Sequence, residues 1–192
     1  LIRRQRQMCI RDSPIEKEVI RMEEMAKTKA SDDKYLLFEL AGEEYGVDIL
    51  KVREIIGLMA ITPVPQTPSF IKGVINLRGK VIPVIDLKVK FGMEDGDYGD
   101  RSCIVVIELQ GKKGPVLTGV VVDGVKEVVN INPEQIDPPP EMGQGIDARF
   151  ILGMAKLGER VSILLDMEKV IGDGGGGILQ KEEGDEGDKG EG

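Results

Sequence analysis

One stretch of this chain occurs twice, and that repeat limits the possible folds more than any other feature. Shifted by 80 positions, residues 70–92 and 150–172 share seven identities in 23 positions. Average residue usage gives only about one or two identities for segments of this length. The identical pairs are Phe70/Phe150, Ile71/Ile151, Gly73/Gly153, Leu77/Leu157, Val81/Val161, Asp86/Asp166 and Gly92/Gly172. We therefore expect a small unit of two strands and a closing helical turn to occur twice.

Short apolar runs separated by turn residues indicate an all-β fold. In the first copy, runs at residues 73–77 and 80–86 flank Arg78 and Gly79, a tight hairpin in which glycine can take a positive φ. Similar runs lie at residues 35–40, 44–48, 103–109, 116–122, 125–129, 150–156 and 161–166. Because neither copy has enough strands to bury both of its faces, we expect two similar barrels that share one chain.

The expected helices are short. A capping signal at Ser13-Pro14 and apolar residues at helical spacing predict an amphipathic helix to about Lys29. Residues 49–56 are apolar at 49, 52, 55 and 56, a spacing that predicts at most two helical turns around Glu54. Asp86 and Asp166 end equivalent strands and could be paired carboxylates of an active site. Equivalent residues of two barrels lie far apart, however, so a helix-capping role is favoured for both.

Composition excludes several kinds of chemistry. The chain has no histidine, so it cannot contain a Ser-His-Asp system, a histidine-ligated zinc site or a phosphohistidine relay. Cys9 and Cys103 are its only cysteines, and Cys103 opens an apolar run that suits a core residue. The acidic stretch at residues 94–100 lacks the glutamate that closes a calcium loop, which favours a solvated turn. We expect no catalytic residue, no metal and no cofactor.

Charge and composition divide the chain into three parts. Residues 1–33 are expected to be a disordered leader with a short amphipathic helix, and residues 34–172 the folded domain. Residues 173–192 are expected to be a disordered acidic tail, because they are rich in glycine and nearly free of apolar side chains. The net charge of −8 disfavours binding to nucleic acid or anionic lipid. No apolar run reaches the roughly 18 residues that cross a bilayer, so we expect a cytoplasmic protein without membrane insertion.

Several linked sequence motifs resemble the CheW family of bacterial chemotaxis coupling proteins. The most specific are Thr-Pro-Val-Pro at residues 62–65, followed by residues 70–79 and 81–87. Supporting matches lie at residues 44–49, at positions 52, 54 and 55, and at residues 119–125, and the resemblance covers residues 34–172. It implies an all-β fold of two intertwined five-stranded SH3-like barrels with short helices, which agrees with the repeat. It also implies a non-catalytic scaffold.

The resemblance implies partners and a binding surface as well. Its partners would be chemoreceptors, the methyl-accepting chemotaxis proteins, and the regulatory domain of the histidine kinase CheA. The protein would then work in the cytoplasm, at the inner face of the membrane, through receptor arrays. The positions that match the family's receptor-facing surface are Val52, Glu54, Ile55, Arg78 and Gly79. We expect Glu54 and Arg78 to approach each other across this surface.

Two other functions remain open on the residues alone. A small hydrolase that uses carboxylates would need a buried pair of Asp or Glu side chains in a pocket. A small β-barrel could also bind nucleic acid, but only seven aromatic residues and a negative body count against that function.

Overall fold

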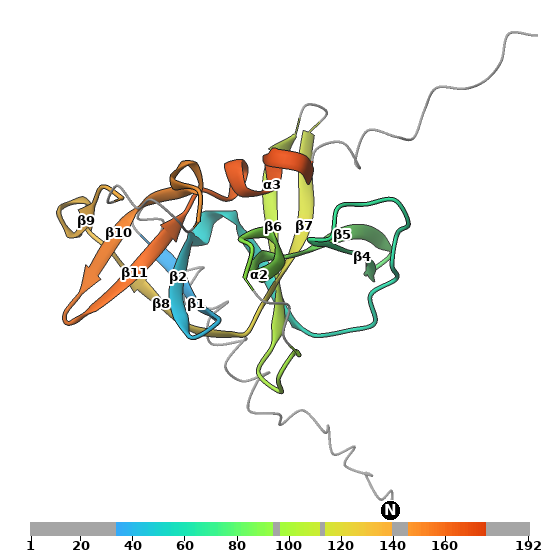
Figure 1. Ribbon diagram of the computed structural model, residues 1–192, viewed down its shortest axis with the longest axis horizontal. Coiled ribbons are helices and arrows are strands. Elements are labelled where there is room, and N and C mark those ends of the chain that lie inside the picture. Colours follow the sequence, from blue (N-terminus) through green and yellow to red (C-terminus); the bar gives the residue numbers. More distant parts are fainter. Residues whose placement is uncertain (1–33, 94–96, 112–113, 140–145, 176–192) are drawn as a thin grey trace, which may run out of the picture.

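The computed structural model describes residues 34–93, 97–111, 114–139 and 146–175, which form two β-sheets side by side (Figure 1). One sheet has the strand order β8-β1-β2-β11-β10-β9 and the other β3-β6-β7-β5-β4, and we call them sub-barrels A and B. The expected all-β fold of two barrels with short helices is confirmed. The predicted leader, its helix at residues 13–29 and residues 176–192 of the predicted tail lie outside the described residues. Residues 173–175, expected to begin the disordered tail, are instead the end of a helix over residues 167–175.

The elements have the following bounds. The strands of sub-barrel A are β1 (Lys34–Leu40), β2 (Glu43–Asp48), β8 (Gly124–Asn130), β9 (Ile136–Asp137), β10 (Ile151–Leu157) and β11 (Arg160–Leu165). The strands of sub-barrel B are β3 (Val52–Gly57), β4 (Ile71–Leu77), β5 (Lys80–Asp86), β6 (Cys103–Gly111) and β7 (Gly114–Val122). The helical elements are η1 (Ile49–Lys51), α2 (Leu87–Lys90), η2 (Pro133–Gln135), η3 (Ala148–Phe150) and α3 (Met167–Gly175).

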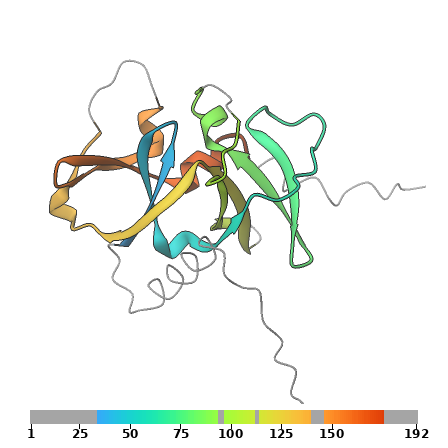
Figure 2. The ribbon, with the colours of Figure 1, turned by 90° about the horizontal axis from the view of Figure 1, so that it is seen from below.

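The chain crosses between the two sub-barrels twice, and this crossing intertwines them. After β2 it passes through η1 into β3 of sub-barrel B, and after β7 it passes through Asp123 into β8 of sub-barrel A. Sub-barrel B therefore consists of five consecutive strands, β3 to β7, whereas sub-barrel A combines the first two strands with the last four. The N-terminal strands β1 and β2 lie beside the C-terminal strands β10 and β11 (Figures 1 and 2).

The repeat found in the sequence extends over both halves of the fold. In the β4–β5 hairpin Gly73 lies opposite Val84, and in the β10–β11 hairpin Gly153 lies opposite Leu164, each just after a register shift. The second strand of each hairpin then runs parallel to another strand of the same sub-barrel: β5 along β7, and β11 along β2. The two-strand unit predicted from the sequence is confirmed and belongs to a larger five-strand unit.

The core lies between the sub-barrels as well as inside each one. Alternate residues of β1 and β6, such as Phe38 and Val105, join a central cluster that both sub-barrels share. The intervening residue Ile104 packs inside sub-barrel B, with Ile75 and Val84. Sub-barrel A has a smaller interior cluster of Ile131, Ala155 and Leu164. Because β6 is buried on both faces, it reads as a continuous apolar run rather than an alternating one.

The helical prediction for residues 49–56 is wrong beyond its first turn. Only η1 is helical, and β3 follows it at once. Val52 pairs with Ile107 and Glu54 with Val106, so Arg53 is an extra residue in a β-bulge. A bulge shifts the inward and outward alternation of a strand by one residue, which produced the apparent helical spacing. No helix in the part of the chain that the structure describes is long and apolar enough to span a membrane.

Candidate protein-binding surface

Glu54 and Arg78 form an ion pair on the surface of sub-barrel B, as expected. The distance between Arg78 Nη2 and Glu54 Oε2 is 2.8 Å. The Arg78 side chain is 80% exposed and the Glu54 side chain only 15%. The carboxylate is therefore held by the barrel, while the guanidinium projects to solvent beside it. Such a pair stabilises the fold little, and its main effect is a fixed shape and charge at the surface.

The pair links two strands that lie at opposite edges of the sheet. Glu54 is on β3 and Arg78 is in the turn after β4, and these two strands are the first and last of sub-barrel B. Their contact requires the sheet to curl on itself, so the ion pair bridges the two edges of the barrel. Arg78 and Gly79 both have positive φ values, 51° and 83°, as a two-residue type I′ turn requires. Gly79 N also donates to Asn76 Oδ1 at 2.9 Å.

The other three positions implied by the resemblance have different surroundings. Val52 is partly buried and packs against the central cluster, while Gly79 is exposed in the turn. Ile55 is buried in that cluster. The structure therefore brings Glu54, Arg78 and Gly79 together at the surface, and it places Ile55 in the core beneath β3.

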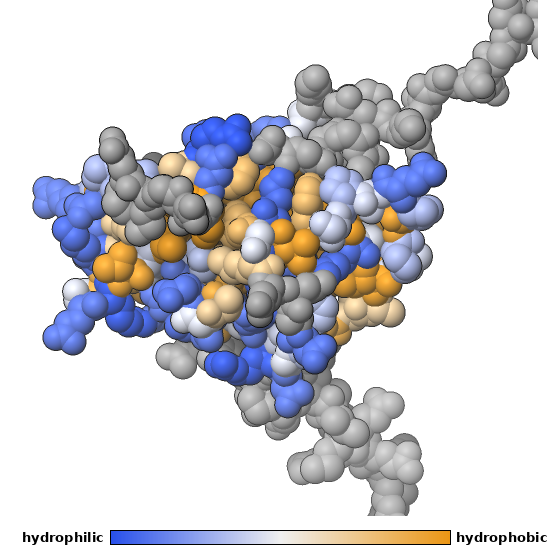
Figure 3. Space-filling view, in the orientation of Figure 1, coloured by the Kyte–Doolittle hydropathy of each residue, from blue (hydrophilic) through white to orange (hydrophobic). Residues whose placement is uncertain are grey.

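A cavity of about 360 Å³ opens between the sub-barrels beside the end of β3. Ile55 and Ile56 line it from sub-barrel B, and Val125 and Lys126 from the start of β8. Residues 99–103 complete the wall. The exposed side chains of Leu58 and Met59 follow β3 directly. Apolar residues also gather across the middle of the face shown in Figure 3, between the two sub-barrels. This mixture of apolar lining and polar rim suits a side chain from another protein.

Charged side chains pair with one another in both sub-barrels. Arg53 donates from both Nε and Nη2 to the Glu108 carboxylate, with an Nε–Oε2 distance of 2.8 Å. This hydrogen bonding lowers the pKa of Glu108 and keeps the carboxylate ionised. In sub-barrel A, burial alone would raise the pKa of Glu44. Hydrogen bonds from Ser162 and Lys126 and the charge of Arg160 outweigh that effect and lower it.

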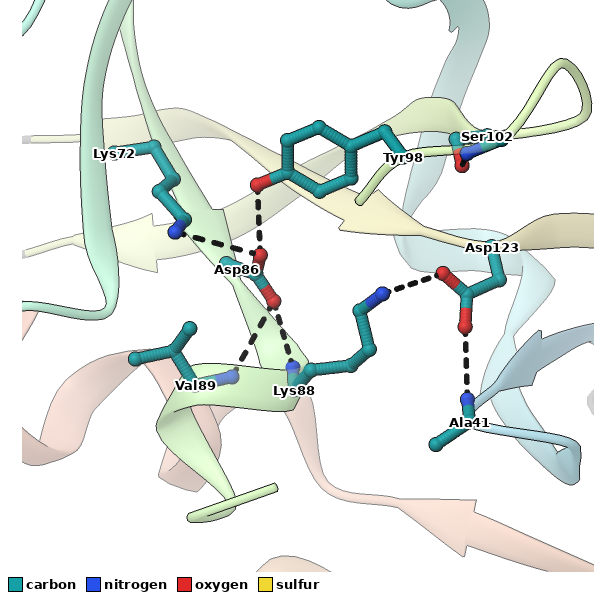
Figure 4. Close-up of polar contacts among 9 residues, drawn as sticks. Ala41, Lys72, Asp86, Lys88, Val89, Tyr98, Ser102 and Asp123 are labelled. Carbon is teal, nitrogen blue, oxygen red and sulfur yellow. Dashed lines mark hydrogen bonds and ion pairs between the residues drawn. The ribbon is translucent and has the colours of Figure 1, made fainter. Parts of the chain in front are cut away.

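The two candidate carboxylates of an active site are helix caps, as favoured from the sequence. Asp86 Oδ1 accepts from Lys88 N at 2.8 Å and Val89 N at 3.3 Å, while Oδ2 accepts from Tyr98 Oη at 2.7 Å (Figure 4). Asp166 Oδ1 accepts from the backbone nitrogens of residues 168 and 169 at 3.1 and 3.3 Å. Each carboxylate is thus used by its own helix.

Cys103 and the acidic stretch give no reactive group in the described residues. Cys103 is buried in the central cluster, and burial raises the pKa of its thiol to about 11, so the thiol is neutral at physiological pH. Within residues 34–93, 97–111, 114–139 and 146–175, no group of three or more Cys, Asp or Glu side chains could hold a metal ion. Residues 94–96 of the acidic stretch lie outside these ranges.

Sequence reasoning missed most of the cavity. Its lining comes from the loop at residues 99–102, from Glu39 and from the start of β8, segments far apart in the sequence. Periodicity carries no signal for such a site, because the site exists only after the chain has crossed between the sub-barrels. The repeat does place Lys80 and Arg160 at equivalent positions, so the sequence could have predicted a cation at the start of the second strand of both hairpins.

The comparisons with known proteins agree with this architecture. The CheW-like domain model matches residues 34–174. The chain is 44% identical over 137 residues to the chemotaxis protein CheW of Klebsiella aerogenes, covering 71% of this chain and 80% of that protein. It is 30% identical over 147 residues to the chemotaxis protein CheW of Treponema pallidum, covering 73% and 84%. A crystal structure of the scaffolding protein TtCheW from Thermoanaerobacter tengcongensis matches with a TM-score of 0.66 at 39% identity, covering 76% of this chain and 91% of that chain.

Two SH3-like sub-barrels that share one core are the architecture of the scaffolding protein to which the chain is similar. The chain belongs to the CheW family, which confirms the resemblance seen in its motifs. Its role is that of an adaptor in chemotaxis.

Proposed function

We propose that this chain joins the cytoplasmic tips of chemoreceptors to the regulatory domain of the histidine kinase CheA. It acts without catalysis, in the cytoplasm, at the inner face of the membrane where receptor arrays form. The working CheW-like domain begins at residue 34 and includes α3, which ends at Gly175. The observation that carries the proposal is the Glu54–Arg78 pair, which presents an exposed guanidinium at a fixed place on the surface of sub-barrel B.

The receptor-facing surface consists of Val52, Glu54, Ile55, Arg78 and Gly79. A receptor tip is helical and amphipathic, so its apolar side chains can enter the cavity lined by Ile55 and Ile56. Its polar side chains then meet the charged pair at the surface of β3. Glu54 fixes the position of the guanidinium, so little side-chain entropy is lost when the receptor binds.

The kinase contact is assigned to the apolar ends of the sub-barrels. Val81 and Val161 are equivalent residues of the repeat, and both are exposed although they are apolar. An exposed apolar side chain next to a hairpin offers the contact that another β-barrel domain needs. Because the two sub-barrels carry such a residue at equivalent positions, one molecule can contact a neighbour at each end.

The receptor contact is tested with the Arg78→Ala variant. Binding of a purified receptor tip fragment is measured by isothermal titration calorimetry, with thermal unfolding followed in parallel. We expect the affinity to fall about tenfold or more, because the guanidinium is a charged anchor of the interface. The melting temperature should change little, because the pair is exposed.

The matched control is Arg149→Ala. Arg149 is also an exposed arginine paired with a carboxylate, that of Asp147, but it lies in η3 of the other sub-barrel. This variant should bind the receptor fragment like the wild type. Equal affinities for Arg78→Ala and the wild type would exclude the proposed receptor surface. Unfolding of Arg78→Ala would show that the arginine is structural.

A further inference from the structure

Each crossover between the sub-barrels is tied by an ion pair to the helix that follows a repeated hairpin. Lys88 Nζ on α2 lies 2.8 Å from Oδ1 of Asp123, the residue between β7 and β8. Lys51 Nζ at the end of η1 lies 2.9 Å from Oε1 of Glu168 on α3. Lys88 and Glu168 are equivalent in the 80-residue repeat. In both links a residue of the helix pairs with a residue of the crossover, but the helix supplies the cation in one link and the anion in the other.

The two links differ in burial. The side chains of Lys88 and Asp123 are 7% and 26% exposed, whereas those of Lys51 and Glu168 are 27% and 57% exposed. An ion pair withdrawn from water is screened less by solvent and salt than an exposed one. The Lys88–Asp123 link is therefore the stronger constraint on the relative positions of the elements that it joins.

Asp123 also connects the link to sub-barrel A. Its Oδ2 accepts from Ala41 N at 2.8 Å, and Ala41 is in the β1–β2 turn (Figure 4). Its own backbone nitrogen donates to Glu39 O at 3.0 Å. On the other side, Lys88 Nζ lies 5.7 Å from the centroid of the Tyr98 ring. One carboxylate thus joins a turn of sub-barrel A to a helix of sub-barrel B.

The link stands in the wall of the space between the sub-barrels. Lys88 and Asp123 line a polar hollow together with Glu39 and residues 99–102. Glu39 and residues 99–102 also line the apolar cavity beside β3. The two spaces share this wall, so a movement of the link changes the cavity. Lys51 and Glu168 line neither space.

We infer that Lys88 and Asp123 are positioning residues that hold the two sub-barrels at one relative orientation and so set the width of the cavity between them. The consequence for receptor binding rests on the proposed function. The effect on orientation does not, because it is a property of the isolated protein. The exposed Lys51–Glu168 link has no such effect.

The test measures orientation without any partner. Spin labels are attached at Val81→Cys and Val161→Cys, the exposed equivalent positions of the two sub-barrels, with Cys9 replaced by serine; Cys103 is buried. The distance distribution is recorded by double electron–electron resonance for the full chain with Lys88→Met, Asp123→Asn, Lys88→Arg or Lys51→Met. Asp123→Asn keeps an acceptor for Ala41 N and so tests the charge alone.

We expect Lys88→Met and Asp123→Asn to broaden or shift the distance distribution and to weaken receptor-fragment binding about fivefold or more. Lys88→Arg, which keeps the charge, and Lys51→Met should match the wild type in both measurements. An unchanged distribution in Lys88→Met and Asp123→Asn overturns the inference, whereas a changed distribution with unchanged affinity overturns only its consequence for receptor binding. If the wild-type protein binds no receptor fragment, the proposed function fails, while the distance measurement still decides whether the link sets the orientation.

Discussion

Sub-barrels A and B repeat one backbone plan, including the charged pairs at their bulges. The extra residue of β3 is Arg53, which pairs with Glu108 on β6. The extra residue of β8 is Lys126, which pairs with Glu39 on β1 at 3.7 Å. Both bulges therefore direct a cation to an acid on the neighbouring strand. The two sub-barrels therefore share the backbone irregularity together with the charge arrangement that accompanies it.

The sub-barrels differ in how the next pair is presented. Glu54 in sub-barrel B and Glu127 in sub-barrel A follow the bulges, and each pairs with an arginine of the nearby hairpin. Arg78 is at the tip of its turn, where the repeat has Gly158 in sub-barrel A. Arg160 begins β11 and also contacts the buried Glu44 at 3.3 Å. The glutamate–arginine pair of sub-barrel B is thus an isolated pair with an exposed arginine, whereas the arginine of the equivalent pair in sub-barrel A also contacts a second, buried glutamate.

The interiors of the two sub-barrels also differ, and sub-barrel A has the more polar one. Ser162 of sub-barrel A is equivalent to Ile82 of sub-barrel B, and Glu44 to Leu117. Ser162 Oγ donates to Glu44 inside sub-barrel A, whereas Ile82 and Leu117 pack in the apolar interior of sub-barrel B. One backbone plan therefore tolerates a polar or an apolar lining, provided that every buried polar group has a partner.

The largest expected effect comes from alanine at Gly73. Its Cβ would lie 2.1 Å from Thr62 O, and the backbone φ of 143° is unfavourable for a side chain. The two hydrogen bonds between Thr62 and Val74 would be disrupted. We expect Gly73→Ala to lower the free energy of unfolding by about 3–5 kcal/mol, measured by urea denaturation.

Gly153→Ala is the equivalent change in sub-barrel A. There the Cβ would meet the Ile136 side chain at 2.4 Å and Asp137 O at 2.8 Å, without a positive φ. We expect a smaller loss, about 2 kcal/mol, because a side chain can move more easily than a backbone carbonyl. Equal losses at the two glycines would contradict the proposed difference in strain.

The two caps should differ in importance. Asp86 is completely buried and accepts from Tyr98 Oη as well as from its helix, whereas Asp166 is partly exposed. We expect Asp86→Ala to cost about 3 kcal/mol and Asp166→Ala about 1 kcal/mol of unfolding free energy. Tyr98→Phe combined with Asp86→Ala should cost less than the sum of the single changes. Additive losses would show that the Tyr98 hydroxyl does not depend on the cap.

The next largest change in unfolding free energy is expected from the polar interior of sub-barrel A. Ser162→Ala leaves a buried Glu44 oxygen without its donor and should cost about 1–3 kcal/mol. The double variant Glu44→Leu/Ser162→Ile reproduces the residues of sub-barrel B. Replacing a buried polar pair by apolar residues is often close to neutral, so this variant should be more stable than Ser162→Ala. Urea denaturation at neutral pH compares the two, and the opposite order would show that the network is required for the fold.

Acid titration tests the same network through the pKa of Glu44. Its folded pKa lies below the ordinary value of 4.5, so the unfolded state binds the proton more tightly. The stabilisation is present above about pH 4.5 and is lost as the pH falls through the folded value. The double variant lacks Glu44, so its unfolding free energy should fall less between pH 5 and pH 3, measured by urea denaturation at each pH. Parallel falls in the two proteins would contradict the lowered pKa.

The sequence predicted the repeated features and missed those that depend on crossing between sub-barrels. The hairpin around Arg78 and Gly79 and the caps at Asp86 and Asp166 are local, so turn chemistry and strand ends were sufficient to predict them. The Glu54–Arg78 contact came from a family resemblance. No local pattern links β3 to the β4–β5 turn, because the contact arises only when the sheet curls.

The errors have equally physical causes. The bulge at Arg53 converted a strand into an apparent helical spacing, since one extra residue changes the phase of the alternation. The Lys88–Asp123 link joins residues 35 positions apart, and the lining of the inter-barrel cavity comes from segments that are still farther apart, such as Glu39 and Lys126. Such contacts depend on where the chain crosses between the sub-barrels, and hydrophobic periodicity does not contain that information.

The smallest effects on stability are expected for the two surface arginines, Arg78 and Arg160. Arg78→Ala should change the unfolding free energy by less than about 0.5 kcal/mol, and Arg160→Ala should lower it by about 1 kcal/mol because Glu44 loses one of its cations. Arg78→Gly suits the positive φ of the turn and copies Gly158 of sub-barrel A, so it should be more stable than Arg78→Ala by about 0.5–1 kcal/mol. Receptor-fragment affinity should follow the opposite order: both Arg78 variants should bind weakly and Arg160→Ala like the wild type. Titration calorimetry gives the receptor-fragment affinity of the three variants, and urea denaturation gives their unfolding free energy. An equal loss of affinity in Arg160→Ala and Arg78→Ala would show that the two ion pairs are functionally equivalent.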